Sequence, residues 1–112
     1  MSISDRNHVY PAKPSSIIMR MMDEAGLTQA QLARALHVSA PRLNMIFKGR
    51  LSITPEIALR LAKVFGTQPL YWLQLRAEYE IFVESQRLSS ELSSLVSLQW
   101  RHEPHQDRLL AA

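Results

Sequence analysis

Apolar residues recur at intervals of three and four along most of this chain, which is the spacing of one face of an α-helix. The first such stretch contains Ile17, Ile18, Met21, Met22 and Ala25. It predicts a helix over about 14–25, with Gly26 as its C-terminal cap. No stretch alternates apolar and polar residues as a half-buried strand does, so we expect an all-α fold of five to six helices.

Two short helices follow, separated by a three-residue turn. Thr28-Gln29-Ala30-Gln31 has the form of a capping box and starts a helix whose apolar side is Leu32, Ala33 and Leu36. His37-Val38-Ser39 interrupts that helix, and Ser39 is placed to cap a second one over about 40–48 that ends at Gly49. The apolar side of the second helix is Leu43, Ile46 and Phe47. This pair predicts a helix-turn-helix at 28–48.

Two longer helices are predicted in the second half of the chain. Thr54-Pro55 starts one that ends at Gly66, and Thr67 with Pro69 starts the other. The second helix has two apolar faces, one of Trp72, Leu75, Tyr79 and Phe82 and one of Leu73, Ala77 and Ile81. Either the two faces form one wide core-facing stripe, or one face packs against the same helix of a second subunit. We place the predicted dimer contact on the face that contains Trp72.

The chain of 112 residues is long enough for one small domain. Residues 1–13 show no period and are expected to form an N-terminal arm, and 14–83 the helix-turn-helix domain. Helical spacing continues weakly at Leu88, Leu92, Leu95 and Val96, which predicts a C-terminal helical extension over 84–100. Residues 101–112 are expected to be a flexible tail.

Charge is unevenly distributed along the chain. The formal net charge is +3, but residues 28–70 hold six Lys or Arg and one acid, whereas residues 71–112 hold four basic and six acidic residues. A basic segment of this kind indicates a face that neutralises phosphates. No apolar run approaches the roughly 20 residues that span a bilayer, and no apolar signal core is present, so we expect a cytoplasmic protein.

The side of the second short helix opposite its apolar residues has side chains that suit base edges in the major groove. Arg pairs with guanine, Asn with adenine, and apolar groups contact the thymine methyl. The predicted base-reading residues are Ala40, Pro41, Arg42, Asn44 and Met45. The start of the first short helix and the cations near the second are expected to bind the DNA backbone. The predicted phosphate-binding residues are Thr28, Gln29, Arg34, Ser39, Lys48 and Arg50.

Several segments resemble a known family. The order Leu27-Thr28-Gln29-Ala30-Gln31-Leu32-Ala33, then Val38-Ser39, then Lys48-Gly49 resembles the Cro/repressor (XRE) helix-turn-helix family. A narrower resemblance, to the HigA antitoxins of the VapI branch, lies in Pro41-Arg42-Leu43-Asn44, Ile53-Thr54-Pro55, Ala58-Leu59-Arg60-Leu61-Ala62, Phe65-Gly66-Thr67, and Tyr71-Trp72-Leu73 with Tyr79. Together these resemblances cover about residues 14–83.

The resemblance implies a homodimer that binds a palindromic operator, represses its own operon and binds a HigB-type ribonuclease toxin. It also implies that the helix from Ser39 to Lys48 contacts the operator. The chain departs from the family pattern at three positions: His37 stands where Gly is frequent, Leu51 where a second cation is common, and Ala40 where a basic residue is common. The departures leave fewer donors for bases and phosphates.

Other classes of function are weighed against this one. Of the four histidines only His102 and His105 are close, Pro104 separates them, and no cysteine is present, so no metal site is expected. The chain has no glycine-rich phosphate loop, nucleophile elbow or paired carboxylates, so we predict that it is not an enzyme and needs no cofactor. A free-standing transcriptional regulator without a toxin partner and an interaction module that does not bind DNA remain as alternatives.

Overall fold

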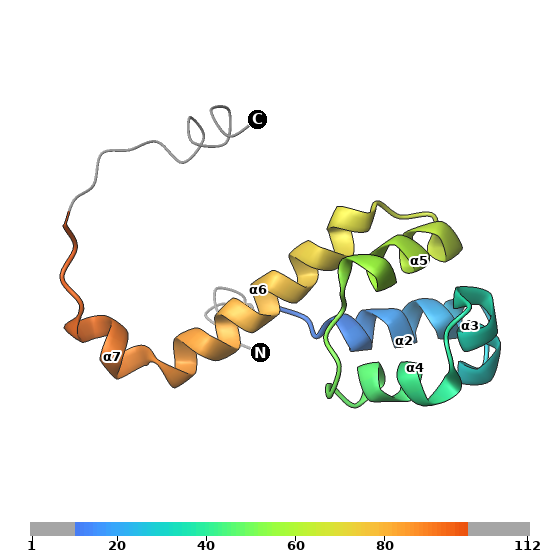
Figure 1. The fold of residues 1–112 in the computed structure, drawn as a ribbon, viewed down its shortest axis with the longest axis horizontal. Helices are drawn as coiled ribbons and strands as arrows, with labels where there is room; N and C mark the ends of the chain where they lie inside the picture. The colour runs from blue at the N-terminus through green and yellow to red at the C-terminus, as the bar shows by residue number, and fades with distance from the viewer. Residues whose placement is uncertain (1–10, 99–112) are drawn as a thin grey trace, which may run out of the picture.

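The computed structural model describes residues 11–98, and within them all regular structure is helical. The helices are α2 (Pro14–Glu24), α3 (Gln29–Leu36), α4 (Ala40–Phe47), α5 (Pro55–Phe65), α6 (Pro69–Arg87) and α7 (Ser89–Ser94). Figure 1 shows α2 to α5 gathered at one end, with α6 running away from them towards α7. The predicted all-α fold of five to six helices is confirmed.

Three helices, α3, α4 and α5, start at hydroxyl caps that the sequence predicts. The predicted start at Thr67 differs: the N-cap of α6 is Gln68, whose side chain makes no cap bond, because Thr67 Oγ1 accepts from Trp72 Nε1 instead. Thr28 Oγ1 accepts from the backbone N–H of Gln31 at 3.1 Å, and the Gln31 side chain accepts from the Thr28 N–H at 2.8 Å, which completes the predicted capping box. Ser39 caps α4 and Thr54 caps α5 in the same way, each at 3.2 Å. Each cap satisfies a backbone donor that the helix cannot, worth about 1 kcal/mol.

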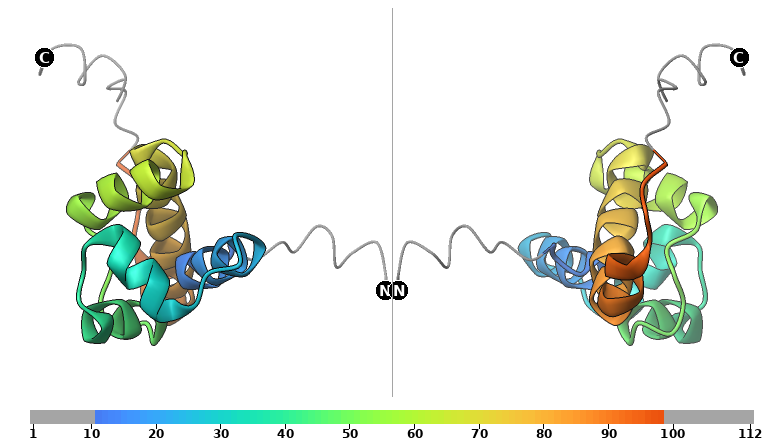
Figure 2. Two further views of the ribbon diagram at one scale, coloured as in Figure 1. Left: turned by 90° about the vertical axis from the view of Figure 1, so that its right-hand side faces the viewer. Right: turned by 90° about the vertical axis from the view of Figure 1, so that its left-hand side faces the viewer.

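One apolar core joins α2, α3, α4, α5 and the first turns of α6. Its fully buried side chains are Ile18, Leu32, Leu43, Ile57, Leu61 and Trp72. In the views of Figure 2, α4 and α5 lie on one side of α6 and α2 lies on the other. The start of α6 is therefore a central element of the core rather than an outer layer.

This position of α6 corrects the predicted dimer contact. Trp72 is 0% exposed, its Nε1 donates to Thr67 Oγ1 at 2.7 Å, and its ring packs edge-on against Tyr71 and near Phe65. The prediction that Trp72 contacts a second subunit is wrong, because the core of its own chain encloses it. Leu75 is half-buried against the same core, so it is not a free contact residue either.

The predicted boundary between residues 83 and 84 falls inside a helix. Helix α6 passes through residues 83 and 84 without a break and ends at Arg87, because nothing in its sequence between Pro69 and Leu88 caps or interrupts it. Over residues 84–98 the predicted extension consists of the last turn of α6 and the six-residue α7, followed by extended backbone at Leu95; residues 99 and 100 lie outside the described residues. The predicted tail at 101–112 and residues 1–10 of the predicted arm lie outside the described residues; residues 11–13 have no regular structure.

Candidate nucleic-acid interface

A tight turn at His37–Ser39 connects α3 to α4. His37 has φ 57° and ψ 42°, a left-handed conformation that ends α3 and that His adopts more readily than most residues other than Gly. Its N–H donates to the carbonyl of Arg34 at 3.1 Å, and the N–H of Val38 donates to that of Ala33 at 3.0 Å. Val38 packs against the core. The turn therefore fixes the direction in which α4 leaves α3.

The outer side of α4 is open at its first turn. Leu43 and Ile46 are buried, which turns the opposite side of the helix outwards. Ala40 and Pro41 are exposed, and Met45 is half-buried. The structure thus leaves an apolar edge at the N-terminal end of α4, where a helix of this motif meets base pairs.

Helices α3 and α4 are linked by two amide side chains. Gln29 Nε2 donates to Asn44 Oδ1 at 3.4 Å, and both residues are half-buried. The side-chain atoms Gln29 Oε1 and Asn44 Nδ2 have no partner among residues 11–98. The bond orients Asn44 while leaving a donor and an acceptor beside each other, which is the pattern that pairs with an adenine edge.

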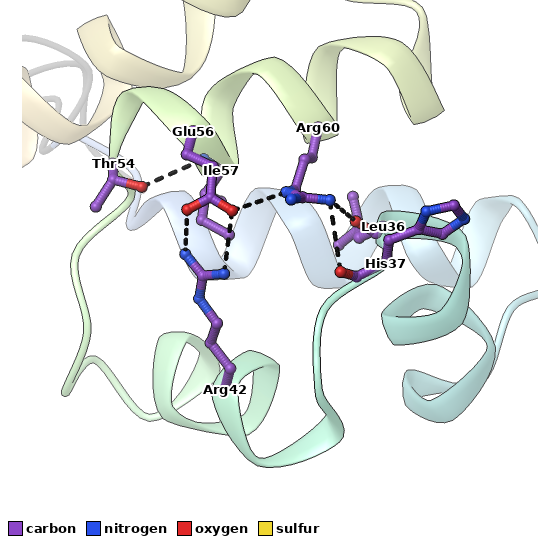
Figure 3. Close-up of polar contacts among 7 residues, drawn as sticks. All are labelled: Leu36, His37, Arg42, Thr54, Glu56, Ile57 and Arg60. Carbon is purple, nitrogen blue, oxygen red and sulfur yellow. Dashed lines mark hydrogen bonds and ion pairs between the residues drawn. The ribbon is translucent and has the colours of Figure 1, made fainter.

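Arg42 does not lie free on α4. Its Nη2 donates to Glu56 Oε1 at 2.8 Å and its Nη1 to Glu56 Oε2 at 3.3 Å, a forked contact with the first turn of α5 (Figure 3). In this structure both terminal nitrogens of Arg42 that would pair with guanine contact a carboxylate, so base reading by Arg42 stays a prediction and requires this contact to open. The sequence contained a signal of this pairing, because Glu56 is the sole acid between residues 28 and 70.

A second guanidinium completes the network. Arg60 Nε donates to Glu56 Oε2 at 3.0 Å, and Arg60 Nη1 donates to the backbone carbonyls of Leu36 at 2.9 Å and His37 at 3.4 Å (Figure 3). These carbonyls lie at the C-terminal end of α3, where the helix itself provides no N–H donor for them. The network of Arg42, Glu56 and Arg60 therefore ties α4, α5 and the turn together. Sequence reasoning did not identify Glu56 or Arg60.

Electrostatics keeps this network ionised. Hydrogen bonds from Arg42 and then Arg60 lower the pKa of Glu56 from 4.5 to about 2. The bond to Glu56 raises the pKa of Arg42 in turn. At neutral pH the three side chains carry one net positive charge.

The predicted phosphate-binding residues lie in three different settings, and their role stays a prediction. The side chain of Gln29 contacts Asn44, as described above. Thr28 and Ser39 use their hydroxyl oxygens as helix caps, so only their O–H groups are available to an anion. Arg34, Lys48 and Arg50 are exposed and form no ion pair within residues 11–98. Lys48 and Arg50 flank Gly49, whose φ of 73° turns the chain sharply after α4.

Other kinds of site find no support in the part of the chain that the structure describes. Among residues 11–98 no group of three His, Asp or Glu side chains is arranged to hold a metal ion. Over the same residues no helix is both long and apolar enough to cross a bilayer.

Helix α4 is exposed at its N-terminal turn, and it is accompanied by the start of α3 and by the cations Lys48 and Arg50, which are unpaired among the described residues. This arrangement defines a helix-turn-helix DNA-binding protein. The profile of the helix-turn-helix family matches residues 18–72. Virulence-associated protein I of Dichelobacter nodosus is 35% identical over 88 residues, which span 77% of this chain and 82% of that protein.

The fold also recurs in solved structures. A HigA-family addiction module antidote protein from Coxiella burnetii is 32% identical, with a TM-score of 0.72 over 80% of this chain and 98% of that one. The Pseudomonas aeruginosa antitoxin HigA, solved with the higBA promoter, is 28% identical, with a TM-score of 0.73 over 80% and 99% of the two chains. The chain belongs to the HigA family of helix-turn-helix proteins, as its motifs predicted.

Proposed function

We propose that this chain is the antitoxin of a HigB/HigA-type module, which binds its own operator, represses transcription there and neutralises a ribonuclease toxin. The observation that supports this most is the α3–turn–α4 unit, exposed at the edge of a fold that also occurs in an antitoxin solved on promoter DNA. In this proposal the protein acts by binding rather than by catalysis. Its two partners are operator DNA and a ribonuclease, and we expect it to meet both in the cytoplasm.

In this proposal α4 lies in the major groove and reads bases from one edge. Asn44, oriented by Gln29, pairs with adenine, and the apolar side chains of Ala40, Pro41 and Met45 contact thymine methyls. The operator contacts are therefore weighted towards A·T pairs. Arg42 takes no part in base recognition while Glu56 holds it.

The backbone contacts surround this edge. The first backbone amides of α3, among them that of Gln29, bind one phosphate at the positive end of the helix dipole. Lys48 and Arg50 hold the backbone at the far end of α4, and Arg34 adds to the field around it. The hydroxyls of Thr28 and Ser39 donate to phosphates from the two helix starts. These contacts position the protein without reading sequence.

A homodimer would place two such units on one palindrome, about 34 Å apart along the duplex. The apolar side chains available for this contact lie beyond the core, on the last turns of α6 and after it. The exposed ones are Ile81, Val83, Leu92, Leu95, Val96 and Leu98. Tyr79 and Phe82, which the sequence assigned to the dimer contact, are half-buried.

The toxin surface belongs to another part of the chain. A ribonuclease must be basic to hold RNA, so the acidic third of the chain after residue 70 is its complementary surface. The basic helix-turn-helix remains for DNA.

Two measurements test this function. Fluorescence anisotropy with the DNA upstream of its own gene, against a random duplex of equal length, should give a specificity ratio of at least roughly 10³. Co-expression with the neighbouring gene product should co-purify a ribonuclease. Specific DNA binding without a co-purified partner would identify a free-standing regulator, such as the relatives named HTH-type transcriptional regulators. No preference for the operator would leave an interaction module.

A further inference from the structure

One acidic side chain faces the basic helix-turn-helix. Glu56 is the sole acid among residues 28–70, and it sits in the first turn of α5, where it meets α4 rather than open solvent alone. Both of its oxygens accept from Arg42, which occupies the third position of α4 (Figure 3). The carboxylate therefore binds the one forked donor that the recognition helix possesses.

The geometry of this contact is also the geometry of DNA recognition. A guanidinium binds a carboxylate, a phosphate and the guanine edge through the same pair of parallel N–H groups. Glu56 and DNA consequently compete for the same two nitrogens of Arg42. A free Arg at this position would bind phosphates of any sequence as readily as a guanine.

Glu56 is itself held in place from the other side. Arg60 donates to Glu56 Oε2 and also to the carbonyls of Leu36 and His37, so the carboxylate is held towards α5 and the turn. Because these side chains are partly exposed, solvent screening limits what the pairs contribute to folding stability. Their main effect is on the position of Arg42, whose guanidinium is held against Glu56 instead of extending from α4 into solvent.

We propose that Glu56 is a specificity-determining residue that never touches DNA: it withholds Arg42 from phosphates and guanines, so that the apolar edge of α4 and Asn44 decide which operator is bound. This inference rests on the proposed DNA-binding function. The lowered pKa of Glu56 has the same origin, because the hydrogen bonds from Arg42 and Arg60 are its largest causes.

The test compares Glu56→Gln with the full-length wild-type chain by anisotropy titration on operator and random duplexes, across a series of salt concentrations. Freeing Arg42 adds one phosphate contact, so the salt slope on random DNA should steepen by about 1 and random-DNA affinity should rise roughly 3- to 10-fold. Affinity for the operator should rise less, and the specificity ratio should fall.

Two further variants separate this effect from loss of charge or of structure. Glu84→Gln removes another exposed carboxylate that is paired with an Arg, on α6 and away from α4, and should leave the slope unchanged. Arg42→Ala in the Glu56→Gln background should return random-DNA binding to the wild-type level. If Glu56 acted only by stabilising the fold, Arg42→Ala would not restore wild-type binding, because it removes a further side chain of the same network.

The outcomes distinguish this inference from the function on which it rests. A wild-type chain that binds operator and random DNA equally overturns both. A wild-type chain that prefers its operator, together with a Glu56→Gln variant whose specificity ratio and salt slope are unchanged or whose binding is not restored by Arg42→Ala, overturns the role of Glu56 alone.

Discussion

The indole Nε1 of Trp72 donates to the hydroxyl of Thr67 at 2.7 Å, across the turn that joins α5 to α6. This bond satisfies the polar atom of a side chain that is otherwise enclosed by the core. It therefore allows the largest aromatic residue of the core to be buried at the base of α6.

Replacing Thr67 by Val should destabilise the fold. The substitution keeps the side-chain volume but leaves a buried N–H without an acceptor, which costs about 1–3 kcal/mol. Chemical denaturation followed by Trp fluorescence measures the free energy of unfolding. Thr67→Ser keeps the hydroxyl and should lose much less; equal losses in the two variants would contradict the role of the bond.

A helix cap gives a second prediction about stability. Thr54→Ala removes the acceptor for the N–H of Ile57 at the start of α5 and should cost about 0.5–2 kcal/mol. Thr54→Ser should restore most of it. The thermal midpoint of the two variants, measured by circular dichroism, checks the difference, and an unchanged midpoint in Thr54→Ala would count against the cap.

The two predicted kinds of DNA contact should respond differently to substitution. Lys48→Ala should weaken binding to all sequences alike and reduce the salt slope by about 1, whereas Asn44→Ala should relax preference at one base pair by about 1–3 kcal/mol. Competition titrations with single-base operator variants measure both effects. If Asn44→Ala weakened every duplex equally, Asn44 would be a backbone contact.

The Glu56 network predicts a specific dependence of stability on pH. Its pKa is lowered from 4.5 to about 2 in the folded chain, so the unfolded chain takes up the proton first as the pH falls. The stabilisation is therefore complete above about pH 4.5 and is lost progressively towards about pH 2. The difference in unfolding free energy between wild type and Glu56→Gln should shrink over that interval. A difference that stays constant would show that Glu56 does not titrate with the fold.

The dimer contact can be located with two matched substitutions. Ile81 on α6 and Leu59 on α5 are 68% and 61% exposed, so a change of either residue to Asp leaves the apolar core undisturbed. Ile81→Asp should shift the proposed dimer towards monomer in sedimentation velocity, and Leu59→Asp should not. Dissociation by Leu59→Asp alone would move the interface to α5.

Local signals predicted the helices well, and tertiary relations were harder to predict. The hydroxyls of Thr28, Ser39 and Thr54 act within three residues of themselves, so their caps follow from sequence alone. Trp72 was misplaced because a helix with two apolar faces does not reveal which face its own chain covers. Arg42 and Glu56 are 14 positions apart, and only the packing of α4 beside α5 brings them together.

Helix α6 is an unbroken rod of 19 residues, about 28 Å long, that connects the core at Trp72 to the apolar surface around Ile81. In the proposed dimer there is thus no pliable joint between one recognition helix and the other, and the distance between half-sites is built into the protein. Adding a single residue to the rod after Tyr79 would turn the far surface by about 100° and advance it by about 1.5 Å. Such a chain could still fold and pair, yet it would require an operator with different spacing.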